Sequence, residues 1–104
     1  MDAVIHVGKN ARDNWELLEN ASADDLWFHV TSESSAYVIV ENNEKPDNEI
    51  EKLTIYKAAA ICKSRSKLKN TKKVSISYLP IQYVKKGKCV GEAILLKKPA
   101  YICV

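Results

Sequence analysis

The sequence predicts an α+β fold, in which a mostly antiparallel β-sheet and two helices form a single domain over residues 1–104. The chain contains many short β-branched runs but only two helical segments, so most strands cannot be joined by the helical crossovers that parallel pairing requires. Its 104 residues fit one domain, since domains usually contain ~50 to ~250 residues. No internal repeat, linker or low-complexity tract divides the chain.

Six strands are expected, and with the two helices they follow the order β-α-β-β-α-β-β-β. The runs rich in β-branched and aromatic residues lie at 3–7, 26–30, 36–41, 74–78, 93–96 and 101–104. The last two are expected to form a hairpin around 97–100, and 81–88 is expected to be a loop. Alternation within 26–30 and 74–78 predicts half-buried strands in a sheet that is covered on one side.

The first helix is expected over 11–19. Asn10 can cap its start, and Ala11, Trp15 and Leu18 recur at spacings of four and three residues. This spacing gives the helix a narrow apolar stripe.

The second helix is expected over 47–64, after the start signal of Pro46. Ile50, Leu53 and Ala60 are expected on its buried side. The small residues 58–60 would allow a close approach to the sheet.

Composition excludes several classes of protein. The chain lacks a run of ~18 apolar residues and a basic-then-apolar start, so neither membrane insertion nor secretion is expected. Cys62, Cys89 and Cys103 are odd in number and widely spaced, which predicts neither disulfides nor a zinc site. We expect three small buried thiols and a reducing compartment, the cytoplasm with the nucleus as alternative. No metal and no cofactor are predicted.

Charge divides the chain into two unequal halves. Residues 1–56 hold 4 Lys/Arg and 12 Asp/Glu, whereas residues 57–104 hold 12 Lys/Arg and one acid. The basic residues of the second half cluster at 63–73, 85–88 and 97–98. Clusters at the ends of different strands can converge into a patch that follows a phosphate backbone. The alternative is that acidic and basic elements alternate over the folded surface and cancel.

Trp27 and His29 have two competing interpretations. A base could stack on Trp27 while His29 donates to a phosphate or a base edge, or both side chains could simply cover the core. Ser34 or Ser35 could act as a nucleophile with nearby His29 as its base, and the protein would then be a hydrolase. No orienting acid or oxyanion glycine accompanies them, so an enzyme is not expected.

Four segments together carry a family resemblance. They are GKNARDNWELL (8–18), DLWFHVTSESSAYVIV (25–40), KAAAICKSRSK (57–67) and VSISYLPIQYVKKGKCVGEAILLKK (74–98). They resemble the NFACT-R (NFACT RNA-binding) domain of the NFACT proteins of ribosome-associated quality control. The resemblance covers nearly the whole chain, and its most specific part is the W-F-H-V segment followed by S-S-A.

The resemblance implies an RNA-binding module with tRNA or ribosomal RNA as target, and DNA as the alternative nucleic acid. Asp25, Trp27 and His29 match the family's D-x-W-x-H, while Lys9 replaces its usual arginine and Tyr37 its second histidine. The other domains of full-length members have no counterpart in these residues, so tail addition is not expected from this domain alone. The runner-up function is an adaptor that docks on an acidic ribosomal or assembly-factor protein surface.

The residues expected to contact nucleic acid come from both halves of the chain. The lysines and the arginine of the basic half would neutralise phosphates, and the others would form a more specific surface. They are Lys9, Asn10, Arg12, Trp27, His29, Ser35, Lys63, Arg65, Lys67, Lys69, Lys72, Lys73, Lys85 and Lys86.

Overall fold

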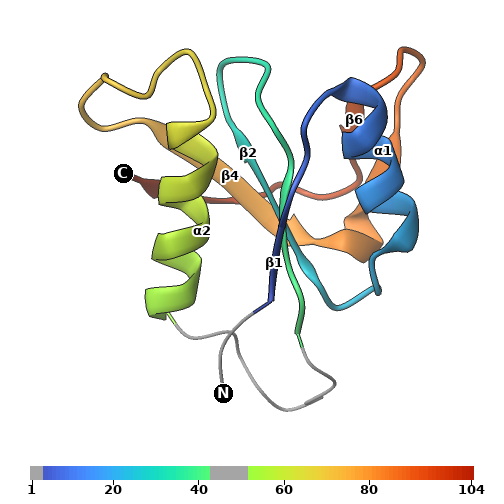
Figure 1. Ribbon diagram of the computed structural model, residues 1–104. Coiled ribbons are helices and arrows are strands. Elements are labelled where there is room, and N and C mark those ends of the chain that lie inside the picture. Colours follow the sequence, from blue (N-terminus) through green and yellow to red (C-terminus); the bar gives the residue numbers. More distant parts are fainter. Residues whose placement is uncertain (1–3, 43–51) are drawn as a thin grey trace.

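The computed structural model describes residues 4–42 and 52–104, and it confirms the α+β class with a mostly antiparallel sheet and two helices (Figure 1). The elements are β1 (Ile5–Val7), α1 (Ala11–Asn20), β2 (Leu26–Val30), β3 (Val38–Val40), α2 (Lys52–Ser64), β4 (Ser75–Pro80), a 3₁₀ turn (Ile81–Tyr83), β5 (Val84–Lys86), β6 (Ala93–Leu95) and β7 (Ala100–Cys103). Five strands form one antiparallel sheet in the order β1-β3-β2-β4-β7, and β5 and β6 form a separate pair.

The expected C-terminal hairpin is wrong. β6 pairs with β5, which lies inside the segment predicted as a loop, and β7 returns to pair with β4 at the edge of the main sheet. Burial explains the choice, because Ile102 of β7 joins the core beneath α2 beside Ile76 of β4. A local hairpin would have left that apolar side chain in water.

Helix α2 covers one face of the sheet with its smallest residues. Ala58, Ala59 and Cys62 are fully buried against Phe28 and Val30 of β2. The close approach expected from the alanine run is therefore confirmed. The expected stripe is misplaced, however, because Leu53 is 60% exposed. Of the predicted helix, residues 47–51 lie outside the described part, as do Pro46 and Ile50.

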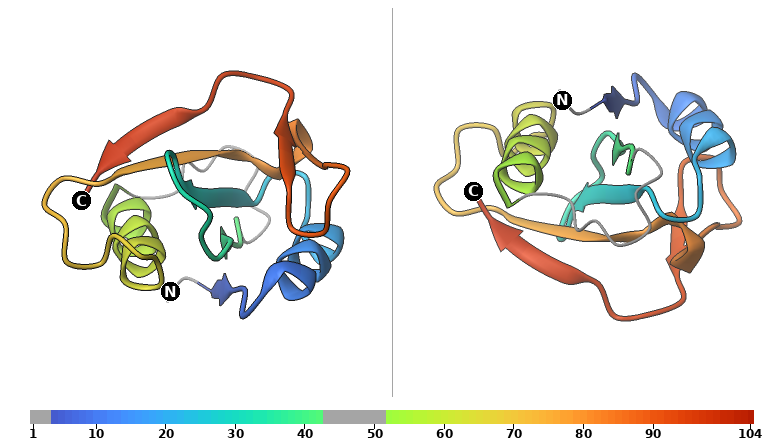
Figure 2. Two further views of the ribbon diagram at one scale, coloured as in Figure 1. Left: turned by 90° about the horizontal axis from the view of Figure 1, so that it is seen from above. Right: turned by 90° about the horizontal axis from the view of Figure 1, so that it is seen from below.

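The opposite face is also covered, but only in part, which corrects the expectation of a sheet covered on one side. Helix α1 and the β5–β6 pair pack there against Trp27, Ile39 and Leu79. Figure 2 shows α1 and α2 on different sides of the β2–β3 hairpin, with β7 at the far edge beyond β4. The rest of this second face lies beside the start of α1, and the candidate site described below is located there.

Two of the three cysteines differ from expectation. Cys62 is buried, but Cys89 and Cys103 are exposed, and all three are free thiols. Cys89 lies in the turn between β5 and β6, and Cys103 lies on edge strand β7. Neither position provides the neighbours on all sides that burial needs.

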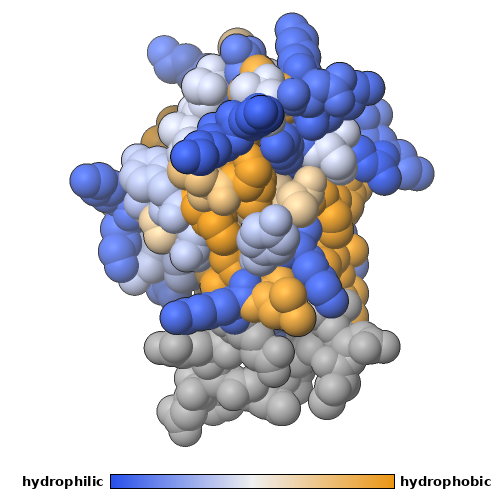
Figure 3. Space-filling model, turned by 90° about the vertical axis from the view of Figure 1, so that its left-hand side faces the viewer, coloured by the Kyte–Doolittle hydropathy of each residue, from blue (hydrophilic) through white to orange (hydrophobic). Residues whose placement is uncertain are grey.

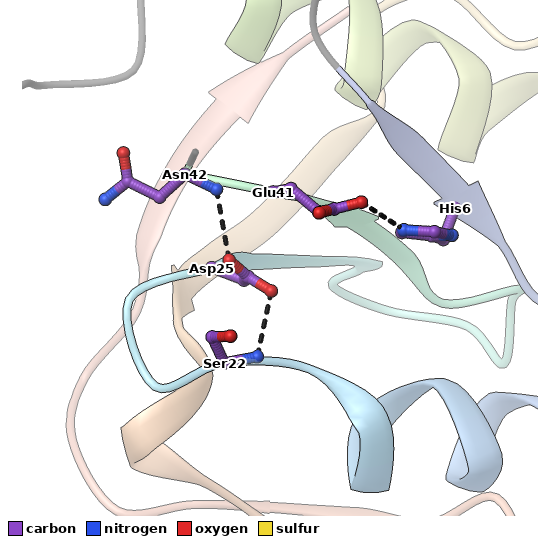
Figure 4. A network of polar contacts seen from close by, with 5 residues as sticks. All are labelled: His6, Ser22, Asp25, Glu41 and Asn42. Carbon is purple, nitrogen blue, oxygen red and sulfur yellow. Dashed lines mark hydrogen bonds and ion pairs between the residues drawn. The ribbon is translucent and has the colours of Figure 1, made fainter. Parts of the chain in front are cut away.

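Asp25 closes the turn between α1 and β2. Its carboxylate accepts from the backbone N–H of Ser22 at 2.9 Å and of Asn42 at 3.0 Å (Figure 4). The carboxylate is thereby satisfied although the residue is only 6% exposed. Figure 4 also shows His6 on β1 bonded to Glu41 just after β3, at 2.8 Å. The Asp of the D-x-W-x-H segment therefore has a structural role in this chain.

Gly8 lies between β1 and α1, directly against the side chain of Asn14. Asn14 of α1 is buried, and its side-chain oxygen accepts from the backbone N–H of Tyr37 at 3.0 Å. A Cβ on Gly8 would lie 1.8 Å from that same oxygen. The glycine is thus required by the buried amide beside it. This bond also explains why β3 begins at Val38 and not at residue 36, because the Tyr37 N–H bonds to a side chain.

Replacing Gly8 with Ala should destabilise the fold by about 1–3 kcal/mol, because the new methyl group must displace the buried Asn14 side chain. Urea unfolding at neutral pH measures the change. Gly87→Ala is the matched control, since its Cβ would meet the side chain of exposed Glu92, which can move away. Equal losses in the two variants would contradict the role assigned to Asn14.

Candidate nucleic-acid interface

A groove of about 950 Å³ opens where the start of α1, the β2–β3 connection and the β5–β6 pair meet. Its floor includes residues of β2 and β4, and Arg65 reaches it from the end of α2. The groove brings together six of the residues predicted from sequence, which come from four separate segments. They are Lys9, Asn10, Trp27, His29, Ser35 and Arg65.

The start of α1 gives one wall of the groove a positive character. Asn10 caps the helix by accepting from the N–H of Asp13 at 2.8 Å, and Asp13 in turn accepts from the N–H of Lys9 at 2.8 Å. This reciprocal cap explains Asn10, whereas Lys9 contributes only its backbone N–H to it. The helix dipole and the Lys9 side chain both favour an anion at this end. Lys9 lines the groove at this end of the helix, whereas Arg12 of the same turn does not.

His29 lies on the groove floor as a neutral imidazole. Its ring stacks on that of Trp27 at 5.4 Å between centroids and 4° between planes, and Tyr37 meets it edge-on at 5.8 Å. Burial lowers the pKa of His29 below its usual 6.5, more than the backbone hydrogen bond at Val30 raises it. A neutral imidazole offers one donor and one acceptor.

Trp27 is 2% exposed, so its ring has no free face on which a base could stack. Its Nε1 is buried and has no hydrogen-bond partner among residues 4–42 and 52–104. The structure therefore favours the core interpretation of Trp27. Both rings line the groove, and His29, which is half-buried, is the more exposed of the two.

Hydroxyl groups complete the floor. Ser35 accepts from the N–H of Val30 at 3.0 Å and lies 3.2 Å from the carbonyl of Ala36, so it holds the β2–β3 connection. Thr31 and Ser77 are linked at 2.8 Å across β2 and β4. These bonds make the floor polar and rigid.

The remaining predicted residues do not line the groove. Lys63 donates to the Val104 carbonyl at 3.1 Å, and Lys86 pairs with Glu19 and lies over the Trp15 ring. The others are exposed, most of them in the connection from α2 to β4, and they are Arg12, Lys67, Lys69, Lys72, Lys73 and Lys85. Figure 3, which views the side of the molecule that carries α2, shows hydrophilic side chains above a band of apolar ones.

Sequence reasoning missed several residues of the groove. Asn14, Thr31, Ser77 and Glu92 all line it, and Glu92 adds a negative charge opposite the cations. Tyr37 supports its wall by donating to the Gly91 carbonyl at 2.6 Å, and burial, with the charge of Glu92, raises its pKa to about 12. The alternation of 74–78 already pointed Ser77 to the face of His29, a signal that could have identified it.

Residues 4–42 and 52–104 present neither a candidate metal cluster nor a membrane-spanning helix. No group of three or more His, Cys, Asp or Glu side chains there is placed to hold a metal ion. Among these residues, neither helix has the length and apolar character needed to cross a membrane.

Known proteins resemble this chain in both sequence and fold. The family model described as NFACT protein RNA binding domain matches residues 1–96. Rqc2 homolog RqcH of Bacillus subtilis (strain 168) is 37% identical over 83 residues, which are 79% of this chain and 14% of that protein. The solved C-terminal part of the fibronectin/fibrinogen-binding protein from Streptococcus suis has the same fold, with a TM-score of 0.87 and 23% identity over 99% of this chain and 41% of that one. The chain thus spans only a small part of its bacterial relative.

The state of His29 predicts how stability depends on pH. Because the folded protein holds the His29 pKa below 6.5, the unfolded chain takes up the proton first. The folded state should therefore lose stability as the pH falls through 6.5, down to the lowered folded pKa. Urea unfolding at about pH 7.5 and about pH 5.5 measures the loss. His29→Gln should show a smaller loss than the parent, and an unchanged loss would contradict this origin.

Proposed function

This chain belongs to the NFACT protein RNA-binding domain family, and from that membership we propose that it is an RNA-binding module linked to ribosome-associated quality control. Its RNA target is tRNA or ribosomal RNA, and its place of action is the cytoplasm. It acts by binding and not by catalysis. The activity of the whole bacterial relative is part of the proposal, because the chain spans 14% of that protein.

The observation that carries the proposal is the groove at the start of α1. A cation from the acidic half, Lys9, and one from the basic half, Arg65, border the same space as His29. Arginine and lysine neutralise phosphates, while a neutral histidine can hydrogen bond to a base edge. The groove thus offers both kinds of contact that RNA recognition uses.

The exposed lysines outside the groove support affinity. Residues 67–73 follow α2 and add four of them, all exposed. Such groups release counterions when they meet phosphates, and this term depends on salt and not on sequence. We therefore assign the lysine-rich connection to attraction and the groove to recognition.

The test is RNA binding at two salt concentrations, with tRNA as the probe. Lys9→Ala and Arg65→Ala should each weaken binding and reduce the slope of log K against log salt by about 0.7 to 0.9. Lys57→Ala is the control, since Lys57 is exposed on α2 and does not line the groove. If the protein does not bind tRNA, or if salt does not change its binding, the proposal is wrong.

A second candidate function is docking on a protein surface, as the adaptor hypothesis expects. Leu53 is 60% and Tyr56 is 53% exposed on α2, beside Lys52 and Lys57. An apolar surface with flanking cations suits an acidic protein partner.

Nuclease treatment separates the two functions. A pull-down of ribosomal particles that survives nuclease, and that Leu53→Ser with Tyr56→Ser abolishes, would support docking through α2. The RNA-binding function expects instead that nuclease removes the particles and that the double variant behaves as the parent does. Lys9→Ala is the control, because it should not affect a nuclease-resistant contact.

A further inference from the structure

On the second face of the main sheet, α1 and the β5–β6 pair pack against Trp27, Ile39 and Leu79, and the groove lies beside them. The antiparallel register aligns His29 of β2 with Ser77 of β4, and Ser77 with Tyr101 of β7. Residues directly opposite each other on antiparallel strands project from the same face. His29, Ser77 and Tyr101 therefore form one row across three strands.

Burial on the other side fixes the direction of this row. Ile76 and Ile102, the neighbours of Ser77 and Tyr101, belong to the core beneath α2. Alternation then directs Tyr101 to the face opposite α2. Tyr101 is 50% exposed, so its ring is available on that face.

A second row with hydroxyl groups lies beside the first. Thr31 follows β2 and its hydroxyl lies 3.0 Å from that of Ser75 and 2.8 Å from that of Ser77. Cys103 is the register partner of Ser75 and is exposed. This part of the face is therefore polar, with Tyr101 as its exposed aromatic ring.

We propose that the row His29–Ser77–Tyr101 is a platform for unpaired bases of single-stranded RNA. Tyr101 stacks on one base, and His29 bonds to the edge of the next. The phosphates between them run toward Lys9 and Arg65 at the groove. The proposal rests on the proposed function and deepens it by naming single-stranded RNA as the ligand and Tyr101 as a contact residue.

The dimensions of the platform suit this ligand. Neighbouring strands lie ~4.8 Å apart, so His29 and Tyr101 are separated by roughly 10 Å at the backbone. Ser77 between them has a small side chain that is only 5% exposed, so a base that reaches from one ring to the other would pass over it. Stacking on a tyrosine needs a base with a free face, and bases inside a duplex have none.

Tyr101 provides a ring for base stacking, which the buried rings beside the groove do not. The two rings beside His29 are taken up in the core, because Trp27 and Tyr37 are both buried. Ser77 lines the groove, and Tyr101 adjoins Ser77 on the next strand. Tyr101 thus supplies the stacking surface that Trp27 cannot.

The experiment compares two labelled RNA probes, a single-stranded uridine-rich oligonucleotide and a fully paired hairpin of the same length, by fluorescence anisotropy. Tyr101→Ala should weaken binding of the single strand by roughly tenfold, the loss expected for one stacked base, and leave the hairpin nearly unchanged. Tyr101→Phe should keep the parent's affinity because it keeps the ring. Tyr56→Ala is the matched control, since Tyr56 is 53% exposed but lies on α2.

Each outcome is informative. If the parent binds tRNA but neither probe, the platform is overturned, and if it does not bind tRNA either, the proposed RNA-binding function itself fails. If the parent binds RNA but Tyr101→Ala binds the single strand as tightly as the parent, or weakens both probes equally, only the platform is overturned. Tyr56→Ala weakening the single strand as much as Tyr101→Ala also overturns it. Photocrosslinking of the unmutated protein to 5-iodouridine RNA should label the peptide that contains Tyr101, and labelling elsewhere alone overturns the platform.

Discussion

The buried carboxamide of Asn14 is the contact on which the rest of the site depends. It projects from α1 and accepts from the N–H of Tyr37, and its nitrogen lies 3.5 Å from the Ser35 carbonyl. Since Asn14 is only 6% exposed, losing it would leave a buried backbone donor unpaired, at a cost of about 1–3 kcal/mol. Gly8 makes room for it. This contact joins the start of α1 to the β2–β3 connection, so the groove has two fixed walls.

The third wall is held by contacts to the same region. Tyr37 donates to the Gly91 carbonyl at 2.6 Å, and Trp15 of α1 donates to the Glu92 carbonyl at 3.0 Å. Gly91 has a φ of +91° and lies against Ala11, where a Cβ would come within 2.7 Å. The segment between β5 and β6 is therefore held close to the start of α1 by side-chain donors that bond to its carbonyls and by a position that suits glycine. The groove exists because three distant segments converge on α1.

The sequence predicted those parts of the fold that local rules govern. The cap at Asn10, the exact extent of β2 and the alternation of β4 all follow from residues close in the chain. The pairing of β7 with β4 could not be predicted in this way, because it depends on whether Ile102 finds a place beneath α2. The same limit applies to the site. Lysines are visible in the sequence, but whether they face one groove is decided by tertiary packing. Lys86, for example, is engaged by Glu19 and Trp15.

The charge split of the chain therefore has a different meaning in three dimensions. Five of the six predicted residues that line the groove belong to the acidic half, and Arg65 is the one from the basic half. A site built this way has few cations and a neutral histidine, which suits hydrogen bonding to bases more than neutralisation of many phosphates. The lysines after α2 lie outside the groove, where they can attract any polyanion without selecting it. Selection is then the task of the groove and of the proposed row on the adjoining sheet face, whose side chains are set by strand register and not by charge.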